Sequence, residues 1–399
     1  MLPLHGVRVI AVEQYGAGPF GTLYLASLGA EVIKIESPRD GGDVSRGVGP
    51  HFVEGVEPSA TSLFFQGLNH NKKSVTLDLS QAEGRAVLHR LVENADALAS
   101  NLRGDVPAKL GITYPQLAPH NPRLVCAHLT AYGRRGPRAA WPGYDYMMQA
   151  EAGYFALTGE PDGPPTRFGL SIVDFMTGLA MALGLVAALL DARQTGTGRD
   201  VDVSLFDVAL FNLNYVATWF LNSGDAPQRV PRSAHLSLTP CQLYHTRDGY
   251  IYLMCNKEKF WHSLCDELGH PEWRADQRFA SYAARLANRD ALTVVVDAAL
   301  AGRDTADWLA RFTGKVPAAP VLDVPEALEN PFVADSDRIQ HLRTVGGVDI
   351  KVLRSPIRLD EPPPAPCPAP RLGEHTDDIL ASLGYDPPKI ESLRNKGII

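Results

Sequence analysis

A single carboxylate, Asp174, stands at the head of a long uncharged segment, residues 175–190. The segment is predicted to form a helix packed on most faces, with Asp174 in or just before its first turn. Unpaired N–H groups at a helix N-terminus stabilise an anion, and the apolar neighbours Ile172, Val173 and Phe175 would exclude water. Asp174 is therefore a candidate nucleophile. The alternative is that it only caps a core helix.

A glycine-rich loop at residues 16–21 is the second candidate site. It follows a β-branched stretch at 7–12 and precedes a helical pattern at 22–28 and a second strand at 31–36, which together predict a βαβ unit. The loop fits G-x-G-x-x-G with the acidic Glu36 about twenty residues further on, as in dinucleotide-binding folds. The pattern indicates either an NAD-dependent dehydrogenase or only tight packing of strand on helix.

Strand and helix patterns alternate from residue 71 to residue 221, which predicts an α/β fold with a mainly parallel sheet. Helix 80–94 would begin with a capping box formed by Ser80 and Glu83. The other elements predicted in this region are strands at 95–100, 124–129 and 200–205 and helices at 106–110, 114–117 and 208–221.

The pattern changes at residue 223, where a linker precedes a hairpin closed at Asp248-Gly249. Helices are predicted after it at 260–268, 283–300 and 306–312, so the inserted part is a smaller α+β domain. The proline-rich run 361–370 must be an extended crossing segment, and Thr376 could cap a helix at 377–383. The predicted domains are 1–222, 223–320 and 321–399.

Composition excludes several classes of function. The net charge of −7 argues against a general affinity for nucleic acid, which needs clustered Lys and Arg. Five cysteines without a C-x-x-C pair indicate neither a metal site nor disulfides. We expect a cytoplasmic protein, because the N-terminus lacks the regions of a signal peptide. We expect no membrane partner, because the uncharged run falls short of the ~20 residues of a spanning helix.

Several segments, taken in order, resemble the class III coenzyme A transferase family, which includes carnitine dehydratase, bile-acid-inducible proteins, formyl-CoA transferases and α-methylacyl-CoA racemases. The resemblance covers nearly the whole chain. Besides the Asp174 segment, it rests on residues 6–10, 17–19, 28–36, 71–79, 121–124, 142–145 and 372–376. It implies a Rossmann-like large domain made from both ends of the chain, a small inserted domain, and a homodimer of two interlocked rings.

The resemblance gives Asp174 the role of nucleophile in coenzyme A transfer. The carboxylate would accept the acyl group as a mixed anhydride and then the coenzyme A as an aspartyl thioester. The expected partners are an acyl-CoA and a small carboxylic acid, with coenzyme A as substrate and no tightly bound cofactor. The apolar surroundings of Asp174 suit transfer rather than hydrolysis.

The resemblance also implies a set of positions that contact the acyl-CoA. Lys109 and Arg103 have the chemistry to pair with phosphates, whereas Arg39 is shifted by two positions from the family's basic residue. The positions implied for coenzyme A and the thioester are Gly16, Ala17, Arg39, Leu77, Asn101, Leu102, Arg103, Lys109, Tyr144 and Asp145.

Racemisation is the alternative within the family. Racemases use the same acid with a histidine at the position that Tyr144 occupies here, and tyrosine, with a pKa near ~10, replaces imidazole poorly in proton exchange. His128 could replace it only if the fold brought it into the site. Transfer is therefore favoured. Arg167, Arg232 and His235 could accept a second carboxylate, so a dicarboxylic acid with succinyl-CoA as donor is the expected substrate pair.

Overall fold

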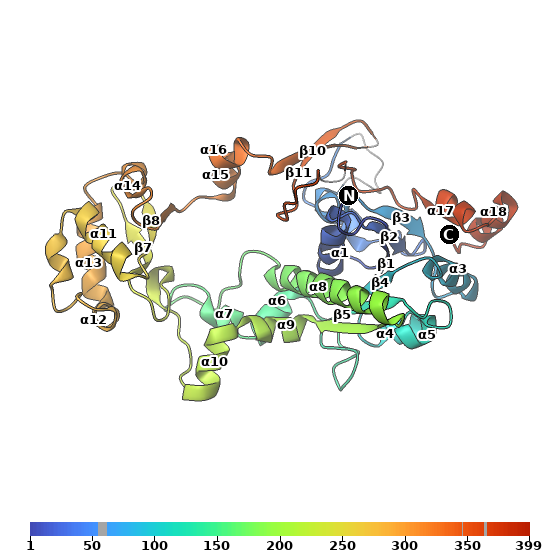
Figure 1. Cartoon of the computed structure of the whole chain (residues 1–399), viewed down its shortest axis with the longest axis horizontal. Helices are drawn as coiled ribbons and strands as arrows, with labels where there is room; N and C mark the ends of the chain where they lie inside the picture. Colours follow the sequence, from blue (N-terminus) through green and yellow to red (C-terminus); the bar gives the residue numbers. More distant parts are fainter. Residues whose placement is uncertain (55–61, 345, 363–364) are drawn as a thin grey trace. The chain divides into compact units, whose positions relative to one another are not determined.

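The structure is a computed structural model of the 399-residue chain, and it describes all residues except 55–61, 345 and 363–364. The stretch 38–58, rich in Gly, Pro and charge, is predicted from the sequence to be a loop. Parts of it and of the proline-rich run 361–370 lie outside the described residues. The chain divides into two compact units (Figure 1). The first contains residues 1–152, 169–214 and 332–399, and the second contains residues 153–168 and 215–331. The three domain ranges inferred from the sequence stay a prediction.

The first unit is built on a six-stranded sheet in the order β3-β2-β1-β4-β5-β6 (Figure 1). Every neighbouring pair in this sheet is parallel, which confirms the α/β prediction. The strands are β1 (Arg8–Val12), β2 (Glu31–Glu36), β3 (Lys73–Thr76), β4 (Ala97–Ser100), β5 (Val125–Thr130) and β6 (Arg199–Ser204). The order reverses between β1 and β4, and ligands of open α/β sheets bind outside the carboxyl ends of the strands at such a point.

Helices cover both faces of this sheet. On one face, α3 (Ala82–Val92) shares a buried apolar core with two C-terminal helices, α17 (Thr376–Ser382) and α18 (Pro387–Asn395). The last residues of the chain thus complete the core of the first unit, and the amide of Asp78 donates to the carbonyl of Ile398 at 2.8 Å. Alternation of side chains along a strand leaves the other face to α1 (Ala17–Ser27) and α8 (Ile172–Thr195).

The remaining elements of the first unit are short. They are η1 (Val44–Gly47), α2 (Leu63–Asn69), α4 (Val106–Leu110), α5 (Tyr114–Leu117), α6 (Asp145–Glu151), α9 (Leu205–Asn212), α16 (Pro331–Ala334), and the antiparallel pair β10 (Ile339–Arg343) and β11 (Asp349–Leu353). The structure thus has a large parallel sheet and smaller antiparallel sheets.

Helix α8 is longer and less enclosed than the sequence indicated. It has 24 residues, so by length and composition it could cross a membrane, although half of its most apolar window is buried within the protein. Its buried side packs on α1, β5 and β6. Its other side is open within this chain: Leu183 is 73% exposed and Leu190 61%. The expectation of a helix packed on most faces is therefore wrong for the single chain.

Two predicted caps are wrong because other polar groups bond the hydroxyls: a neighbour in the sequence for Ser80, and a strand distant in the sequence for Thr376. Ser80 donates to the carboxylate of Asp78 at 2.6 Å, and α3 begins after Gln81 instead. Thr376 lies inside α17, and its hydroxyl accepts from the amide of Thr76 in β3 at 3.0 Å. A short polar side chain bonds whichever polar group lies within its reach, and this competes with capping.

The second unit contains the predicted hairpin, β7 (Cys241–His245) with β8 (Tyr250–Met254), extended by β9 (Ala318–Pro320) into an antiparallel sheet. The other elements are α7 (Tyr154–Leu157), α10 (Asn214–Ser223), η3 (Pro231–Ser233), α11 (Glu258–Leu268), η4 (Pro271–Arg274), α12 (Tyr282–Ala287), α13 (Arg289–Leu300), α14 (Thr305–Phe312) and α15 (Val324–Glu329). Two predicted helices are each broken in two. Asn214, with φ 46°, separates α9 from α10, and Asn288 separates α12 from α13.

Candidate active site

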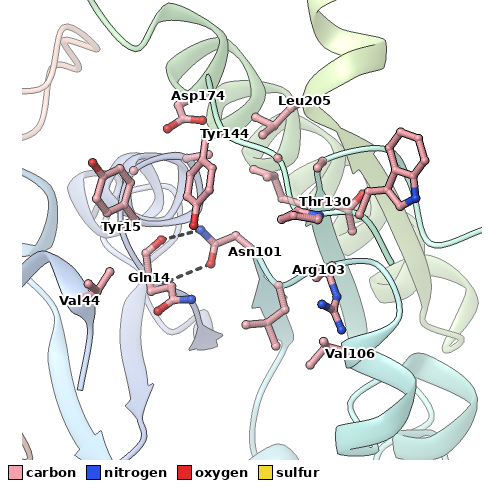
Figure 2. Close-up of a pocket in the computed structure, with 18 residues that line it drawn as sticks. Gln14, Tyr15, Val44, Asn101, Arg103, Val106, Thr130, Tyr144, Asp174 and Leu205 are labelled. Atoms are coloured by element: carbon pink, nitrogen blue, oxygen red, sulfur yellow. Dashed lines mark hydrogen bonds between the residues drawn. The ribbon is translucent and has the colours of Figure 1, made fainter. Parts of the chain in front are cut away.

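A cavity of about 700 Å³ lies at the carboxyl ends of β1, β4 and β5, and Asp174 is part of its wall (Figure 2). Four segments supply most of the lining: the turn after β1, the residues after β4, the end of β5, and the loop that precedes α6. The lining residues are Gln14, Tyr15, Gly16, Ala17, Val44, Asn101, Leu102, Arg103, Val106, Leu129, Thr130, Ala131, Trp141, Pro142, Gly143, Tyr144, Asp174 and Leu205.

Two glycines let α1 and α8 cross closely enough to bring Asp174 to this cavity. A Cβ on Gly178 would lie 2.5 Å from the carbonyl oxygen of Ala17, and a Cβ on Gly21 would lie 2.5 Å from the carbonyl oxygen of Gly178. Any side chain at either position would force the two backbones apart. The crossing therefore fixes the first turn of α8 against the first turn of α1.

Gly16 meets the carboxylate of Asp174 directly. A Cβ on Gly16 would lie 2.6 Å from Oδ2 of Asp174. Gly16 is also the N-cap residue of α1, so the carboxylate lies at the end of a helix whose first N–H groups have no intrahelical partner. The turn after β1 thus places backbone donors beside a potential nucleophile.

Asp174 is 7% exposed, and its electrostatic environment opposes ionisation. Burial and, secondarily, the charge of Asp145 raise the pKa of Asp174 to about 7. Asp145 also accepts the backbone N–H of Asp174 at 2.9 Å. This N–H group at the start of α8 is therefore bonded to Asp145 and does not stabilise the Asp174 carboxylate. Desolvation and the negative charge of Asp145 raise the pKa of Asp174 by more than the helix N-terminus, expected from the sequence, lowers it. A carboxyl group with such a pKa is half ionised near neutral pH.

Comparison with known proteins identifies the family of this chain. The sequence profile described as CoA-transferase family III matches residues 4–376, nearly the whole chain. The chain belongs to CoA-transferase family III. It is similar to the succinate–glutarate CoA-transferase of Agrobacterium fabrum, with 35% identity over 96% of each chain. It is also similar to the acetyl-CoA:oxalate CoA-transferase of Acetobacter aceti, with 38% identity over 83% of this chain and 84% of that one.

A solved structure supports the same assignment. The crystal structure of a CAIB/BAIF family protein from Brucella suis matches with a TM-score of 0.82 and 34% identity, over 96% of this chain and 99% of that one. The protein is thus a family III CoA-transferase, and the resemblance stated from the sequence is confirmed. The dehydrogenase interpretation of the glycine loop is replaced by this assignment.

The structure brings most of the implied acyl-CoA positions of the transferase together. Gly16, Ala17, Asn101, Leu102, Arg103 and Tyr144 line the cavity with Asp174. Asp145 lies behind it, 4% exposed, where it contacts Asp174. Leu77 lines an adjoining cavity of about 490 Å³ that shares Gln14, Val44, Leu102 and Val106 with the first.

The three implied basic groups all pair with carboxylates other than Asp174. Arg103 and Lys109 both pair with Asp105, and the side chain of Lys109 is 66% exposed. Arg39 lies 3.6 Å from the carboxylate of Asp78, which lines the adjoining cavity. Each cation already has a carboxylate partner, so a phosphate would have to compete for it.

Asn101 has a structural task in addition to lining the cavity. Its side-chain amide donates to the carbonyl of Gln14 at 2.6 Å and accepts from the N–H of Gln14 at 2.9 Å (Figure 2). Gln14, Tyr15 and Trp141 also line the cavity but were not predicted from the sequence as site residues. The only signal for the first two was that they adjoin Gly16 at the end of the predicted strand.

His128 does not reach the cavity. It is fully buried in β5, with Nδ1 2.8 Å from the hydroxyl of Ser100 and Nε2 3.1 Å from Oδ1 of Asp200. Both ring nitrogens are therefore used in the sheet. The position of a racemase histidine is occupied by Tyr144, which is 63% exposed.

The groups considered for a second carboxylate belong to the second unit. Arg232 pairs with Asp297 at 2.7 Å. Nδ1 of His235 accepts two backbone N–H groups, from Ser237 and Leu238, and burial lowers the pKa of His235. Within the described part of the chain, no group of three or more His, Cys, Asp or Glu side chains is placed to hold a metal ion.

Proposed function

We propose that this transferase moves coenzyme A from succinyl-CoA to a small dicarboxylic acid through an aspartyl-CoA thioester on Asp174. The observation that carries the proposal is the buried carboxylate of Asp174 against Gly16 at the wall of the cavity. The named relatives support the substrate class, because succinate, glutarate and oxalate are all dicarboxylic acids.

The reaction would proceed by four nucleophilic substitutions at a carbonyl carbon. In each of them one anion, a carboxylate or a thiolate, attacks and another leaves. The Asp174 carboxylate attacks the donor thioester, and the coenzyme A thiolate leaves as the mixed anhydride forms. The thiolate then attacks the aspartyl carbonyl and expels the donor acid. The acceptor carboxylate attacks the aspartyl thioester, the thiolate leaves again, and its attack on the acceptor carbonyl releases Asp174 and the new acyl-CoA.

Three features of the site suit this course. The raised pKa gives Asp174 a more basic and therefore more nucleophilic carboxylate than an ordinary aspartate. Its burial limits hydrolysis of the anhydride and thioester. We infer that the N–H groups of Gly16 and Ala17, which belong to the N-terminus of α1 beside Asp174, stabilise the oxyanion of the tetrahedral intermediates.

The two adjoining cavities suggest the course of the coenzyme A. We infer that the thioester lies in the cavity with Asp174, and that the adenine end reaches the second cavity near Leu77. Arg103 would then exchange Asp105 for a phosphate. Bidentate pairing of guanidinium with phosphate makes this exchange favourable.

A peptide mass measurement tests the proposal. The protein is incubated with succinyl-CoA and quenched with borohydride, and the peptide containing Asp174 is analysed. Reduction of Asp174 to the alcohol is the expected result, and a panel of acceptors (oxalate, malonate, succinate and glutarate, with acetate as the monocarboxylic control) then identifies the second substrate. An unmodified Asp174, with deuterium entering the α position of a branched acyl-CoA, would favour racemisation instead.

We also propose the assembly that the family resemblance implies, a homodimer of interlocked chains with a Rossmann-like large domain in each. The leucine face of α8, formed by Leu179, Leu183 and Leu190, supports it, because a group of exposed apolar side chains is typical of a surface that another chain covers. A cytoplasmic location stays a prediction.

A further inference from the structure

The turn that carries Gly16 is held by four side chains from elsewhere in the first unit: Lys34, Lys72, Asn101 and Asp43. The carbonyl of Glu13 accepts from Nζ of Lys34, and the carbonyl of Pro19 accepts from Nζ of Lys72, both at 2.9 Å. Asn101 bonds both backbone groups of Gln14. The path of the backbone beside Asp174 is thus fixed from outside the turn itself.

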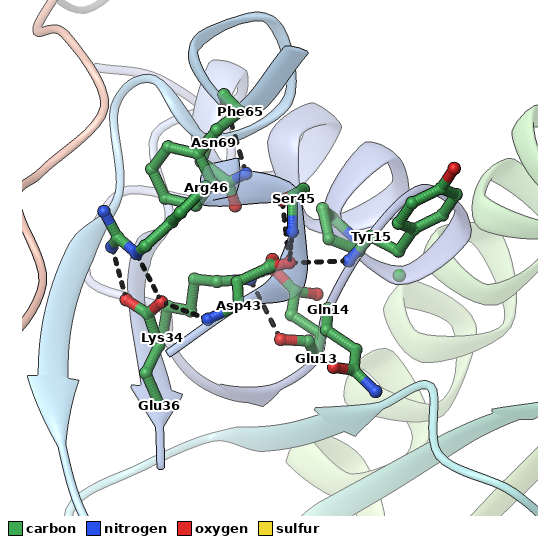
Figure 3. Close-up of polar contacts among 12 residues, drawn as sticks. Glu13, Gln14, Tyr15, Lys34, Glu36, Asp43, Ser45, Arg46, Phe65 and Asn69 are labelled. Carbon is green, nitrogen blue, oxygen red and sulfur yellow. Dashed lines mark hydrogen bonds and ion pairs between the residues drawn. The ribbon is translucent and has the colours of Figure 1, made fainter. Parts of the chain in front are cut away.

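Asp43 bonds the residue that precedes Gly16. Its Oδ1 accepts the backbone N–H of Tyr15 at 3.0 Å and that of Ser45 at 2.8 Å, and its Oδ2 lies 2.8 Å from Nζ of Lys34 (Figure 3). Burial acts to raise the pKa of Asp43, but the Lys34 ammonium and the backbone N–H groups outweigh it and hold that pKa below its ordinary value. Asp43 is therefore an anion whose oxygens hold the amide of Tyr15.

Tyr15 has an unusual backbone conformation. Its φ is 67°, in the left-handed region that L-residues with bulky side chains avoid. The next residue is Gly16, whose position against the Asp174 carboxylate has no room for a Cβ. Relaxation of Tyr15 to a negative φ would swing the peptide plane between Tyr15 and Gly16 and move the donors beside the nucleophile.

The ion pairs beneath this turn are costly to bury, so their placement needs a reason. Lys34 and Lys72 are both fully buried, as is the side chain of Glu13, which pairs with Lys72 at 2.9 Å and lies 3.9 Å from Lys34. None of these three side chains lines the cavity with Asp174. Apolar side chains would fill the same space without desolvated charge, but they could not hold the carbonyl and amide groups of the turn.

We propose that Asp43, held by Lys34, is a positioning residue for the transferase reaction: it keeps Tyr15 in the left-handed conformation and so aims the N–H groups of Gly16 and Ala17 at the Asp174 carbonyl. Asp43 acts through the backbone and not on the substrate. The inference rests on the proposed role of Asp174 as nucleophile.

The first test is the variant Asp43→Ala. We expect kcat to fall 10- to 100-fold, since small misplacements of catalytic groups have effects of that size, while KM for succinyl-CoA changes less than threefold. Glu31→Gln is the matched control, because Glu31 is also a carboxylate paired with cations, Arg8 and Lys73, but lies at the start of β2 and lines neither cavity. It should leave kcat and KM within twofold of wild type. Asp43 also borders the second cavity, so a rise in KM with unchanged kcat would make it a substrate contact and overturn the proposal.

The second test is a double-mutant comparison at Tyr15. Asparagine adopts a positive φ more readily than tyrosine does, so Asp43→Ala should lower kcat less than threefold when it is introduced into Tyr15→Asn. Equal losses in the two backgrounds would show that Asp43 does not act through the conformation of Tyr15, and would overturn the proposal.

A third comparison leaves the Asp43 network intact, and it decides the matter if Asp43→Ala fails to fold. Tyr15→Val places a β-branched residue where φ is positive, and should lower kcat at least tenfold more than Tyr15→Asn does. Equal kcat values for the two variants would contradict the proposal.

A structural readout separates this inference from the proposed function. In Asp43→Ala, the amides of residues 16–18 and 20 should exchange with deuterium faster than in wild type, whatever the substrate. Unchanged exchange would overturn the positioning role. If exchange rises but Asp174→Ala retains full transfer activity, then the role of Asp174 fails while the conformational role of Asp43 stands.

Discussion

At the scale of the residue, the pKa of Asp174 links the chemistry to pH. Because nucleophilic attack needs the carboxylate, kcat/KM should rise with pH and level off above an apparent pKa of about 7. Asp145→Asn removes the nearby negative charge and should move this apparent pKa downward. A pH–rate profile of both proteins measures it. A flat profile from pH 5 to pH 8, or an upward shift in Asp145→Asn, would contradict the electrostatic account.

The same carboxylate also affects stability. The folded state keeps the proton up to about pH 7, whereas an unfolded aspartate releases it near 3.8. The stabilisation that this proton supplies is therefore complete below the pKa of the unfolded aspartate, 3.8, and is lost as the pH rises through the pKa of the folded state, about 7. Relative to wild type, Asp174→Asn should gain ~2–4 kcal/mol of unfolding free energy between pH 4 and pH 8. Urea denaturation at both values measures this gain, and a constant difference would contradict it.

At the scale of the element, the contact of α1 with α8 depends on two glycines. Gly178→Ala gains helix propensity, but its Cβ would meet the backbone of Ala17 at 2.5 Å. We expect a net loss of ~1–3 kcal/mol, as for other overpacked sites, and a lower kcat as Asp174 moves from Gly16. Thermal unfolding and steady-state kinetics measure the two effects.

Gly184→Ala is the matched control on the same helix. A Cβ there meets only a methyl group of Val201, at 3.0 Å, and a side chain can give way where backbone cannot. The variant should stay within ~1 kcal/mol of wild type, because the gain in helix propensity offsets the tight contact. If Gly178→Ala is as stable and active as this control, the crossing does not position Asp174.

At the scale of the whole molecule, the proposed interlocked dimer predicts unusual exchange behaviour. Sedimentation should give a mass of twice 43.3 kDa. Two populations that carry different isotopes should form no mixed dimers when they are mixed in native buffer, because linked rings cannot separate without unfolding. Mixed dimers should appear after the chains are unfolded and refolded together, and native mass spectrometry detects them. A monomer, or exchange in native buffer, would contradict the assembly.

Leu183→Glu tests the surface that such a dimer would cover. In the single chain this side chain is 73% exposed, so the charge should cost little there. In an assembly that covers α8, the charge would be buried without a partner and should lower the thermal stability markedly. Wild-type stability and mass in this variant would show that the leucine face of α8 stays open.

Much of the fold could be predicted from the sequence because its signals are local. Continuous apolar strands and helix periodicity predict a parallel α/β sheet, and most strands lie within a few residues of their predicted bounds. Asp174 could be singled out for the same reason, since a lone charge at the head of an uncharged helix is visible in the sequence. The glycine-rich loop identified the neighbouring turn.

The tertiary structure decided what those groups do. Asp145, distant in sequence, and burial together reverse the influence of the helix end on the pKa of Asp174. Similarly, the cap expected at Thr376 is lost because the fold brings β3 to its hydroxyl group, and Tyr15 takes its conformation beside Asp43 and the buried Lys34. Sequence periodicity by itself determined the order and type of the elements, because each depends on near neighbours. Desolvation, charge and the geometry of polar contacts depend on segments that only the fold brings together, so they could not be predicted from the sequence.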